Sequence, residues 1–230
     1  MNIALVLAAG KGIRMNVSTP KQFLIVDKKP LFIHTIDRFM ESNLIDKVLL
    51  VINKDDEYTV KNFLKKYKFQ KELLITYGGE TRQKSVFNGL RYLENKVNSK
   101  DIILIHDAAR ANVSCDIIKR NIEYVCEFDS AITGIEITDT VVQKNEKDFK
   151  YIDREKLISI QTPQSFYFED IFEAYEKCAL EGYNSATDDS SIMKFVGKEI
   201  RFVKGSKYNI KVTTEEDLKL IGLYLQNKIR

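Results

Sequence analysis

The chain has 230 residues, enough for one substantial α/β domain with at most a small appendage. Hydrophobic residues make up 44% and charged residues 30%, the balance of a soluble globular protein, and no apolar run reaches the roughly 20 residues that span a bilayer. A net charge of only +3 argues against a general nucleic-acid-binding protein. Because the apolar N-terminus lacks the basic segment of a signal peptide, we expect one cytoplasmic domain over residues 1–230, without a nucleic-acid or membrane partner.

The first part of the chain alternates apolar runs with segments of helical periodicity. In chain order we expect strand 2–9, helix 30–41, strand 46–52, helix 55–67, strand 73–77, helix 81–93, strand 101–106, helix 114–127 and strand 131–136. Strands separated by helices favour βαβ units, in which parallel strands share one sheet and helices cover both of its faces. The sequence therefore predicts an α/β domain with a mostly parallel central sheet.

The pattern changes after this last strand. Residues 137–159 are mostly polar and charged, lean toward β structure and have no strong helical face, so they predict either an extended arm or a surface hairpin. Thr162, Pro163 and Gln164 read as a turn. Helices are expected at 168–181, at 188–196 and from Thr214 onward, with a strand at 199–203.

A glycine-containing loop follows the first strand. It reads Leu7-Ala8-Ala9-Gly10-Lys11-Gly12-Ile13-Arg14-Met15. The dinucleotide-binding pattern would need a third glycine where Met15 stands, and a Walker A loop would need Ser or Thr directly after Gly-Lys. The loop still suits phosphate, because glycines let backbone N–H groups approach phosphate oxygens and Arg14 and Lys21 add positive charge.

The loop, together with Pro20-Lys21-Gln22, resembles the nucleotidyltransferases, and its ending is similar to the cytidylyltransferases of methylerythritol 4-phosphate and ribitol 5-phosphate. Further strings match that family in order along the chain: Gly78-Gly79-Glu80-Thr81-Arg82-Gln83-Lys84-Ser85-Val86, His106-Asp107-Ala108-Ala109-Arg110, Asp139-Thr140, Asp153-Arg154, Gln161-Thr162-Pro163-Gln164-Ser165-Phe166, Thr187-Asp188-Asp189 and Asn209-Ile210-Lys211-Val212-Thr213. Ala111 departs from the family pattern, which usually has proline there, and this departure concerns local rigidity only.

The resemblance implies a single Rossmann-like nucleotidyltransferase domain that transfers CMP from CTP to a small alditol phosphate. The implied catalytic cations are Arg14, Lys21, Lys211 and Arg154. The implied nucleotide-binding residues are Ala8, Ala9, Gly10, Gly12, Gly79, Glu80, Ser85 and Ala108. The implied binding residues for the second substrate are Asp107, Arg110, Thr140, Arg154 and Thr162.

The same resemblance implies a cofactor and a partner. Mg²⁺ would be held mainly by substrate phosphates, with Asp107 as the candidate protein ligand. The segment around Thr140 and Arg154 would form an arm that reaches a second subunit, which predicts a homodimer. His106 is expected to pack at a strand end rather than to act as a base.

Three alternatives remain beside the methylerythritol phosphate enzyme of isoprenoid precursor synthesis. Ribitol-5-phosphate cytidylyltransferases, which make CDP-ribitol for wall or capsule polymers, tend to read HDAVR where this chain has Ala109, and they often lack Thr187-Asp188-Asp189. Sugar-1-phosphate nucleotidyltransferases fit the PKQ and NIKVT strings poorly. A non-catalytic nucleotide-binding regulator would be expected to lose the cationic residues, and all four are present here.

Overall fold

A computed structural model describes residues 1–10, 20–146 and 148–226. Within these residues a central sheet has the strand order β11-β7-β10-β6-β1-β4-β5. The strands are β1 (Asn2–Ala8), β4 (Lys47–Ile52), β5 (Glu72–Tyr77), β6 (Ile102–Asp107), β7 (Ser130–Glu136), β10 (Ile158–Tyr167) and β11 (Phe202–Lys204). Neighbouring strands are parallel except β10, which runs antiparallel to both β6 and β7. The expected mostly parallel α/β sheet is therefore confirmed.

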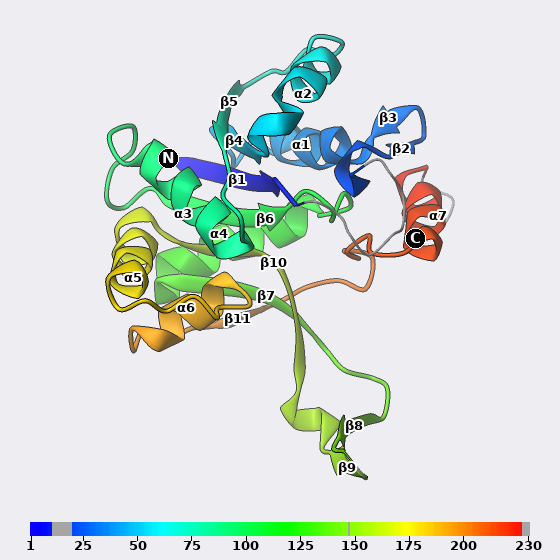
Figure 1. The fold of residues 1–230 in the computed structure, drawn as a ribbon, viewed down its shortest axis with the longest axis vertical. Coiled ribbons are helices and arrows are strands. Elements are labelled where there is room, and N and C mark those ends of the chain that lie inside the picture. Colours follow the sequence, from blue (N-terminus) through cyan, green and yellow to red (C-terminus); the bar gives the residue numbers. More distant parts are fainter. Residues whose placement is uncertain (11–19, 147, 227–230) are drawn as a thin grey trace.

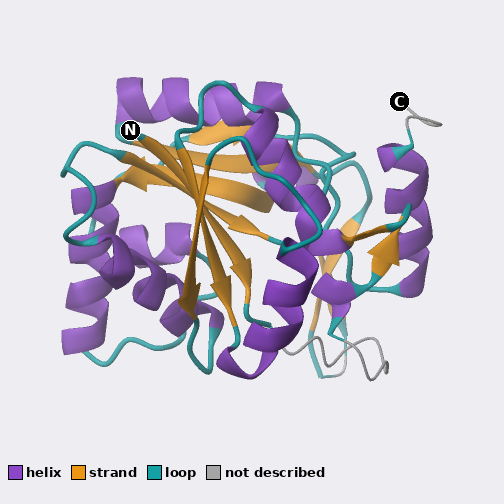
Figure 2. Ribbon diagram, turned by 90° about the horizontal axis from the view of Figure 1, so that it is seen from above, coloured by secondary structure: helices purple, strands orange, loops and turns teal. Residues whose placement is uncertain are grey.

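Helices cover both faces of this sheet (Figure 2). The side chains of β1 alternate between the two faces, because successive residues of a strand point in opposite directions. Ala4 and Val6 belong to the apolar cluster under one set of helices, and Ile3 and Leu5 to the cluster under the other. The first set is α1 (Leu31–Glu41), α2 (Glu57–Leu64) and α4 (Cys115–Phe128); the second is α3 (Arg82–Leu93), α5 (Phe168–Leu180) and α6 (Asp189–Phe195).

Strand β10 is the main departure from the predicted elements. The turn expected at Thr162, Pro163 and Gln164 lies inside this strand, where the pairing register shifts and the Thr162–Pro163 peptide is cis. The polar side chains from Gln161 to Ser165 are buried, and other elements supply hydrogen-bond partners to them. Gln164 Nε2 donates to Asp188 Oδ2 at 2.9 Å, and Ser165 Oγ donates to Asn121 Oδ1 at 2.9 Å. A segment whose composition predicts a turn is thus part of a buried strand.

The segment between β7 and β10 extends away from the sheet (Figure 1). Its strands β8 (Val141–Lys144) and β9 (Phe149–Ile152) form a separate two-stranded antiparallel sheet, and the short 3₁₀ helix η4 (Arg154–Lys156) follows. Tyr151 is 68% exposed on this segment. The segment and the first two residues of β10 together are called the arm (residues 137–159). An extended arm, rather than a hairpin lying on the surface, is what the chain forms.

The C-terminal helix α7 (Glu215–Leu225) begins where the sequence predicts, after Thr214. The Thr214 hydroxyl accepts from the Asp217 N–H in a capping box. Helix α7 packs beside the small hairpin of β2 (Ile25–Val26) and β3 (Lys29–Pro30), and the short 3₁₀ helices η2 (Lys21–Phe23) and η3 (Lys54–Asp56) complete the elements.

Ala111, where the family usually has proline, is fully buried in the small apolar cluster that α7 closes. No helix in the described ranges is both long and apolar enough to cross a bilayer.

Candidate active site

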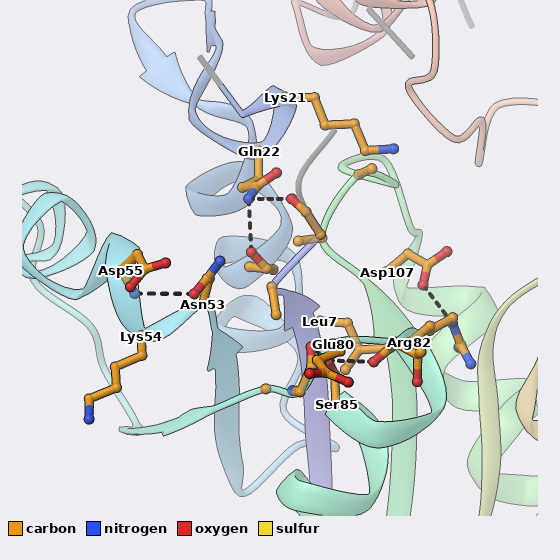
Figure 3. A pocket seen from close by; sticks show the side chains of 18 of the residues that line it. Leu7, Lys21, Gln22, Asn53, Lys54, Asp55, Glu80, Arg82, Ser85 and Asp107 are labelled. Atoms are coloured by element: carbon orange, nitrogen blue, oxygen red, sulfur yellow. Dashed lines mark hydrogen bonds and ion pairs between the residues drawn. The ribbon is translucent and has the colours of Figure 1, made fainter. Parts of the chain in front are cut away.

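A cavity of about 590 Å³ lies at the carboxyl ends of four neighbouring parallel strands (Figure 3). The last residues of β1 and β6 and the segments that follow β1, β4, β5 and β6 supply Ala8, Ala9, Gly10, Asn53, Lys54, Asp55, Gly78, Gly79, Glu80, Thr81, Asp107, Ala108 and Ala109. Leu7, Lys21, Gln22, Arg82, Ser85 and Lys211 complete the lining. Open α/β sheets bind their ligands at the carboxyl ends of their strands, because the loops that follow the parallel strands converge there.

Most residues predicted to bind the nucleotide line this cavity. They are Ala8, Ala9, Gly10, Gly79, Glu80, Ser85 and Ala108, and Lys21, Lys211 and Asp107 lie beside them. Gly12 and Arg14 lie outside the described residues. The structure thus brings together residues from distant parts of the sequence, and their role in holding a nucleotide stays a prediction.

The backbone at Ala8 and Gly10 is held by a glutamine that the sequence analysis did not assign to the site. The buried side chain of Gln22 donates from Nε2 to the carbonyl oxygens of Ala8 and Gly10, each at 2.9 Å. Across the cavity, the Gly79 N–H donates to Ser85 Oγ at 3.1 Å. Two walls of the cavity are therefore fixed by side-chain to backbone hydrogen bonds.

Asp107 lies at the end of β6 between two cations. Lys211 Nζ donates to Asp107 Oδ2 at 2.6 Å, and Arg82 Nε donates to Asp107 Oδ1 at 3.3 Å. Burial alone would raise the pKa of the Asp107 carboxyl, but the positive charges of Arg82 and Lys211 outweigh that effect and hold this pKa far below its usual range. Asp107 is therefore a carboxylate at any physiological pH.

His106 is packed in the interior, as expected. Its Nε2 lies 3.1 Å from the Arg110 carbonyl oxygen, which can only accept a hydrogen bond, so Nε2 carries the proton of the neutral ring. Nδ1 is then the acceptor for the Thr162 hydroxyl at 3.0 Å. Burial, the largest influence, lowers the pKa of His106 to about 4. His106 is thus a neutral, fully buried structural residue.

The predicted residues Thr162 and Arg110 lie beside His106, behind the cavity lining rather than in it. Thr162 is buried, and its hydroxyl accepts from the Asp107 N–H at 3.1 Å. Arg110 Nη1 donates to the Asn209 carbonyl oxygen at 2.8 Å, and burial lowers the pKa of its guanidinium. In this structure Thr162 therefore holds the backbone at Asp107, and Arg110 holds the backbone at Asn209.

Thr140 and Arg154 do not approach the cavity of their own chain. Both are exposed on the arm, and Arg154 Nη1 donates to the Thr138 carbonyl oxygen at 2.6 Å. The arm carries these two residues away from the sheet (Figure 1). Of the five residues predicted for the second substrate, only Asp107 therefore lines the cavity of its own chain, and Thr140 and Arg154 are the two that lie on the arm.

Sequence reasoning missed Arg82 and Asp189 as parts of the site. Arg82 donates from Nη1 and Nη2 to the two carboxylate oxygens of Asp189, at 3.0 and 2.7 Å. Both stand inside the family-like strings, so a signal for them was present. Asn53 and Asp55, on the opposite side of the cavity from Arg82 in Figure 3, follow β4 without any motif that would have marked them.

Comparisons with known proteins agree with this geometry. The family model described as 2-C-methyl-D-erythritol 4-phosphate cytidylyltransferase matches residues 2–227. A protein of that name from Clostridium acetobutylicum is 40% identical over 95% of this chain and 94% of its own length, and one from Clostridium botulinum strain 657 is 42% identical over 99% and 98%. The crystal structure of 4-diphosphocytidyl-2C-methyl-D-erythritol synthase from Anaerococcus prevotii is 31% identical and superposes with a TM-score of 0.82, covering 98% of this chain and 96% of that one. The chain therefore belongs to the 2-C-methyl-D-erythritol 4-phosphate cytidylyltransferase family.

Proposed function

We propose that this protein transfers CMP from CTP to 2-C-methyl-D-erythritol 4-phosphate, releasing pyrophosphate and forming 4-diphosphocytidyl-2-C-methyl-D-erythritol for isoprenoid precursor synthesis. The observation that carries the proposal is the cavity at the strand ends, where the predicted nucleotide-binding residues gather with Lys21 and Lys211. The full-length relatives carry the name of this activity. CTP is a cytoplasmic metabolite, so we place the reaction in the cytoplasm.

The proposed chemistry requires no side chain to act as a base. A phosphate oxygen of the acceptor attacks the α-phosphorus of CTP, a new P–O bond forms, and the bond to the leaving pyrophosphate breaks. A phosphate monoester has a second pKa of about 6, so the nucleophile is already ionised at neutral pH. The neutral, enclosed His106 is consistent with a reaction that needs no proton transfer at this position.

The main barrier to this reaction is electrostatic. A triphosphate of roughly −4 must approach a phosphate of roughly −2, and fixed cations in a poorly hydrated cavity lower the cost of that approach. Lys21 and Lys211 line the cavity and would bind the triphosphate, with Arg14 as a further predicted cation. Arg154 would bind the acceptor phosphate.

Mg²⁺ fits this site only as an ion carried by the substrate. Among the described residues, no group of three or more His, Cys, Asp or Glu side chains could hold a metal ion, whereas Asp107 offers one carboxylate beside the proposed phosphate positions. Magnesium commonly takes one or two carboxylates together with substrate phosphates and water. When bound, it would neutralise phosphate charge, with Asp107 as its protein ligand.

The proposed active enzyme is a homodimer. Thr140 and Arg154 are remote from the cavity of their own chain, and exposed apolar side chains lie on the same arm, including Phe149 and Tyr151. An arm that packs on a second copy would cover these side chains and deliver the two polar residues to the partner's cavity. This arrangement would give a role to an arm that extends away from the sheet of its own chain.

One assay tests the proposed activity and its main alternative together. Pyrophosphate release is measured with CTP and Mg²⁺ against methylerythritol 4-phosphate and, in parallel, ribitol 5-phosphate. We expect turnover with the first acceptor to exceed that with the second by at least about 100-fold, because acceptor hydroxyls that lose their partners cost several kcal/mol. Faster turnover with ribitol 5-phosphate would establish the alternative, and CTP binding without turnover would indicate a regulator.

A further inference from the structure

A row of alternating charges runs from Lys211 through Asp107 and Arg82, which line the cavity, to the buried Asp189. Figure 3 shows the link between Asp107 and Arg82 at one side of the cavity. The four formal charges sum to zero, so the row as it stands offers no net positive charge to a polyanion. A triphosphate can use the ammonium group of Lys211 fully only if Asp107 releases it.

The two cations on Asp107 differ in their freedom to move. Lys211 is a flexible point charge whose side chain is 38% exposed. Arg82 is fixed, because its planar fork binds both oxygens of Asp189 and only Nε remains for Asp107. Lys211 can therefore turn toward a bound phosphate, whereas Arg82 stays with the carboxylate.

Asp189 is itself held by the fold. Its side chain is fully buried, and it accepts a hydrogen bond of 2.7 Å from the Tyr175 hydroxyl. It is the first residue of α6, a helix capped by Asp188 and tied to β10 because the Ser190 N–H donates to Gln164 Oε1 at 2.7 Å. The position of Arg82 is thus set by the packing of α5, α6 and β10 rather than by the cavity.

We propose that Arg82 is a positioning residue that keeps a counter-charge on Asp107 while Lys211 moves to the triphosphate. Without Arg82, the triphosphate would have to compete with a buried carboxylate for the same ammonium group, and leaving that carboxylate unpaired is costly. This inference rests on the proposed CTP-binding function and adds a residue that acts on the nucleotide only through Asp107.

A double-mutant cycle on CTP affinity tests the inference. The dissociation constant of CTP is measured by calorimetry without Mg²⁺, so that the proposed role of Asp107 as a magnesium ligand does not affect the result. The proteins compared are the wild type, Arg82→Lys, Asp107→Asn and the double variant. Arg82→Lys keeps a positive charge near Asp189. A lysine ammonium, however, cannot bind both carboxylate oxygens of Asp189 in the bidentate way and Asp107 at the same time. We expect it to weaken CTP binding at least about tenfold in the wild-type background and less than about twofold when Asp107 is Asn.

The results of the cycle distinguish an effect of Arg82 through Asp107 from a direct effect on the nucleotide. An equal loss in both backgrounds would mean that Arg82 acts directly on the nucleotide or through general stability, and would overturn the inference. Undetectable CTP binding by Asp107→Asn would overturn it as well, since the carboxylate would then serve the nucleotide rather than compete with it. A wild type that fails to bind CTP even with Mg²⁺ present would overturn the proposed function. Normal wild-type binding together with equal losses in the two backgrounds would overturn only the role of Arg82.

Two further variants guard against loss of folding. Tyr175→Phe removes one hydroxyl from Asp189 and leaves the four charges in place; we expect a lower unfolding midpoint in urea with CTP affinity within about twofold of wild type. If Arg82→Lys does not fold, the neutral pair Arg82→Gln with Asp189→Asn removes the clamp without leaving a buried charge. The same loss of CTP affinity is expected there, and unchanged affinity would contradict the inference.

Discussion

His106 and Asp107 are adjacent in β6 and both are buried, yet their surroundings act on their ionisation differently. The ring nitrogens of His106 bond to a carbonyl oxygen and a hydroxyl rather than to a carboxylate, so the cost of burying charge dominates and keeps the ring neutral. Asp107 has Arg82 and Lys211 on its two oxygens, and their attraction exceeds the cost of burial. Ionisation at this strand end is thus set by which side chains the neighbouring elements bring to it.

The lowered pKa of His106 makes the protein less stable in acid. The unfolded chain binds a proton near pH 6.5 and the folded chain only near pH 4, so stability falls as the pH drops below 6.5. Between pH 7 and pH 5 this residue should cost up to about 2 kcal/mol of unfolding free energy. Urea unfolding at both pH values should show a smaller drop for His106→Asn than for the wild type, and an NMR titration of His106 with a midpoint near 6.5 would contradict the prediction.

Lys21 and Lys211 should matter for turnover and little for folding. Each lines the cavity, and removing one preorganised charge from a transition state typically costs about 100-fold or more in rate. We expect that loss in kcat for Lys21→Ala and for Lys211→Ala, with urea midpoints close to wild type. Lys119→Ala is a matched control, because this exposed lysine on α4 pairs with Glu123 and does not line the cavity. Near-normal turnover in either cavity variant would argue against positioning and charge stabilisation as the mechanism.

At the scale of elements, the cavity depends on how closely the segments after β1 and β5 approach each other. A Cβ atom added at Gly78 would lie 2.6 Å from the Ala9 Cβ and 2.7 Å from Ser85 Oγ, so this contact requires glycine. A Cβ added at Gly10, which lines the cavity, would meet no atom of the described residues within 4 Å. The two glycines thus serve different purposes, one for packing between loops and the other for access by a ligand.

These two glycines give a matched pair of variants. Gly78→Ala should lower the unfolding free energy by about 1–3 kcal/mol, because the added methyl forces the two loops apart. Gly10→Ala should leave stability unchanged and weaken CTP binding, because the methyl stands where backbone and phosphate are expected to approach each other. Urea unfolding and calorimetric CTP titration measure both effects. Equal stability loss in both variants would show that the loop contact is not specific to Gly78.

At the scale of the whole molecule, the arm extends away from the sheet and so from the cavity of its own chain. If Arg154 serves the partner's cavity, an inactive Lys211→Ala chain and an inactive Arg154→Ala chain should restore each other when mixed. Random pairing makes half of the dimers mixed, and each mixed dimer has one intact site, so activity should return to about a quarter of wild type. Absence of recovery after subunit exchange would show that each site uses its own arm.

How much of this protein the sequence by itself determines depends on the range of the interactions concerned. Apolar runs and helical periodicity specify the strand and helix order through the first five strands, since each pattern depends on residues close along the chain. The glycine loop, Lys21 and the family-like strings likewise identify many of the cavity residues, but not Asn53 or Asp55. Local signals also place the cap at Thr214 correctly.

Only the tertiary structure decides the rest. Thr162, Pro163 and Gln164 of β10 have a composition that predicts a turn. They lie in a buried strand, where Asp188 and Asn121, both distant in sequence, accept hydrogen bonds from Gln164 and Ser165. Arg82 stands in a recognisable string, but its clamp on Asp189 joins positions 107 residues apart. Burial and charge pairing depend on tertiary contacts between segments that are distant in sequence, and a local sequence pattern does not specify those contacts.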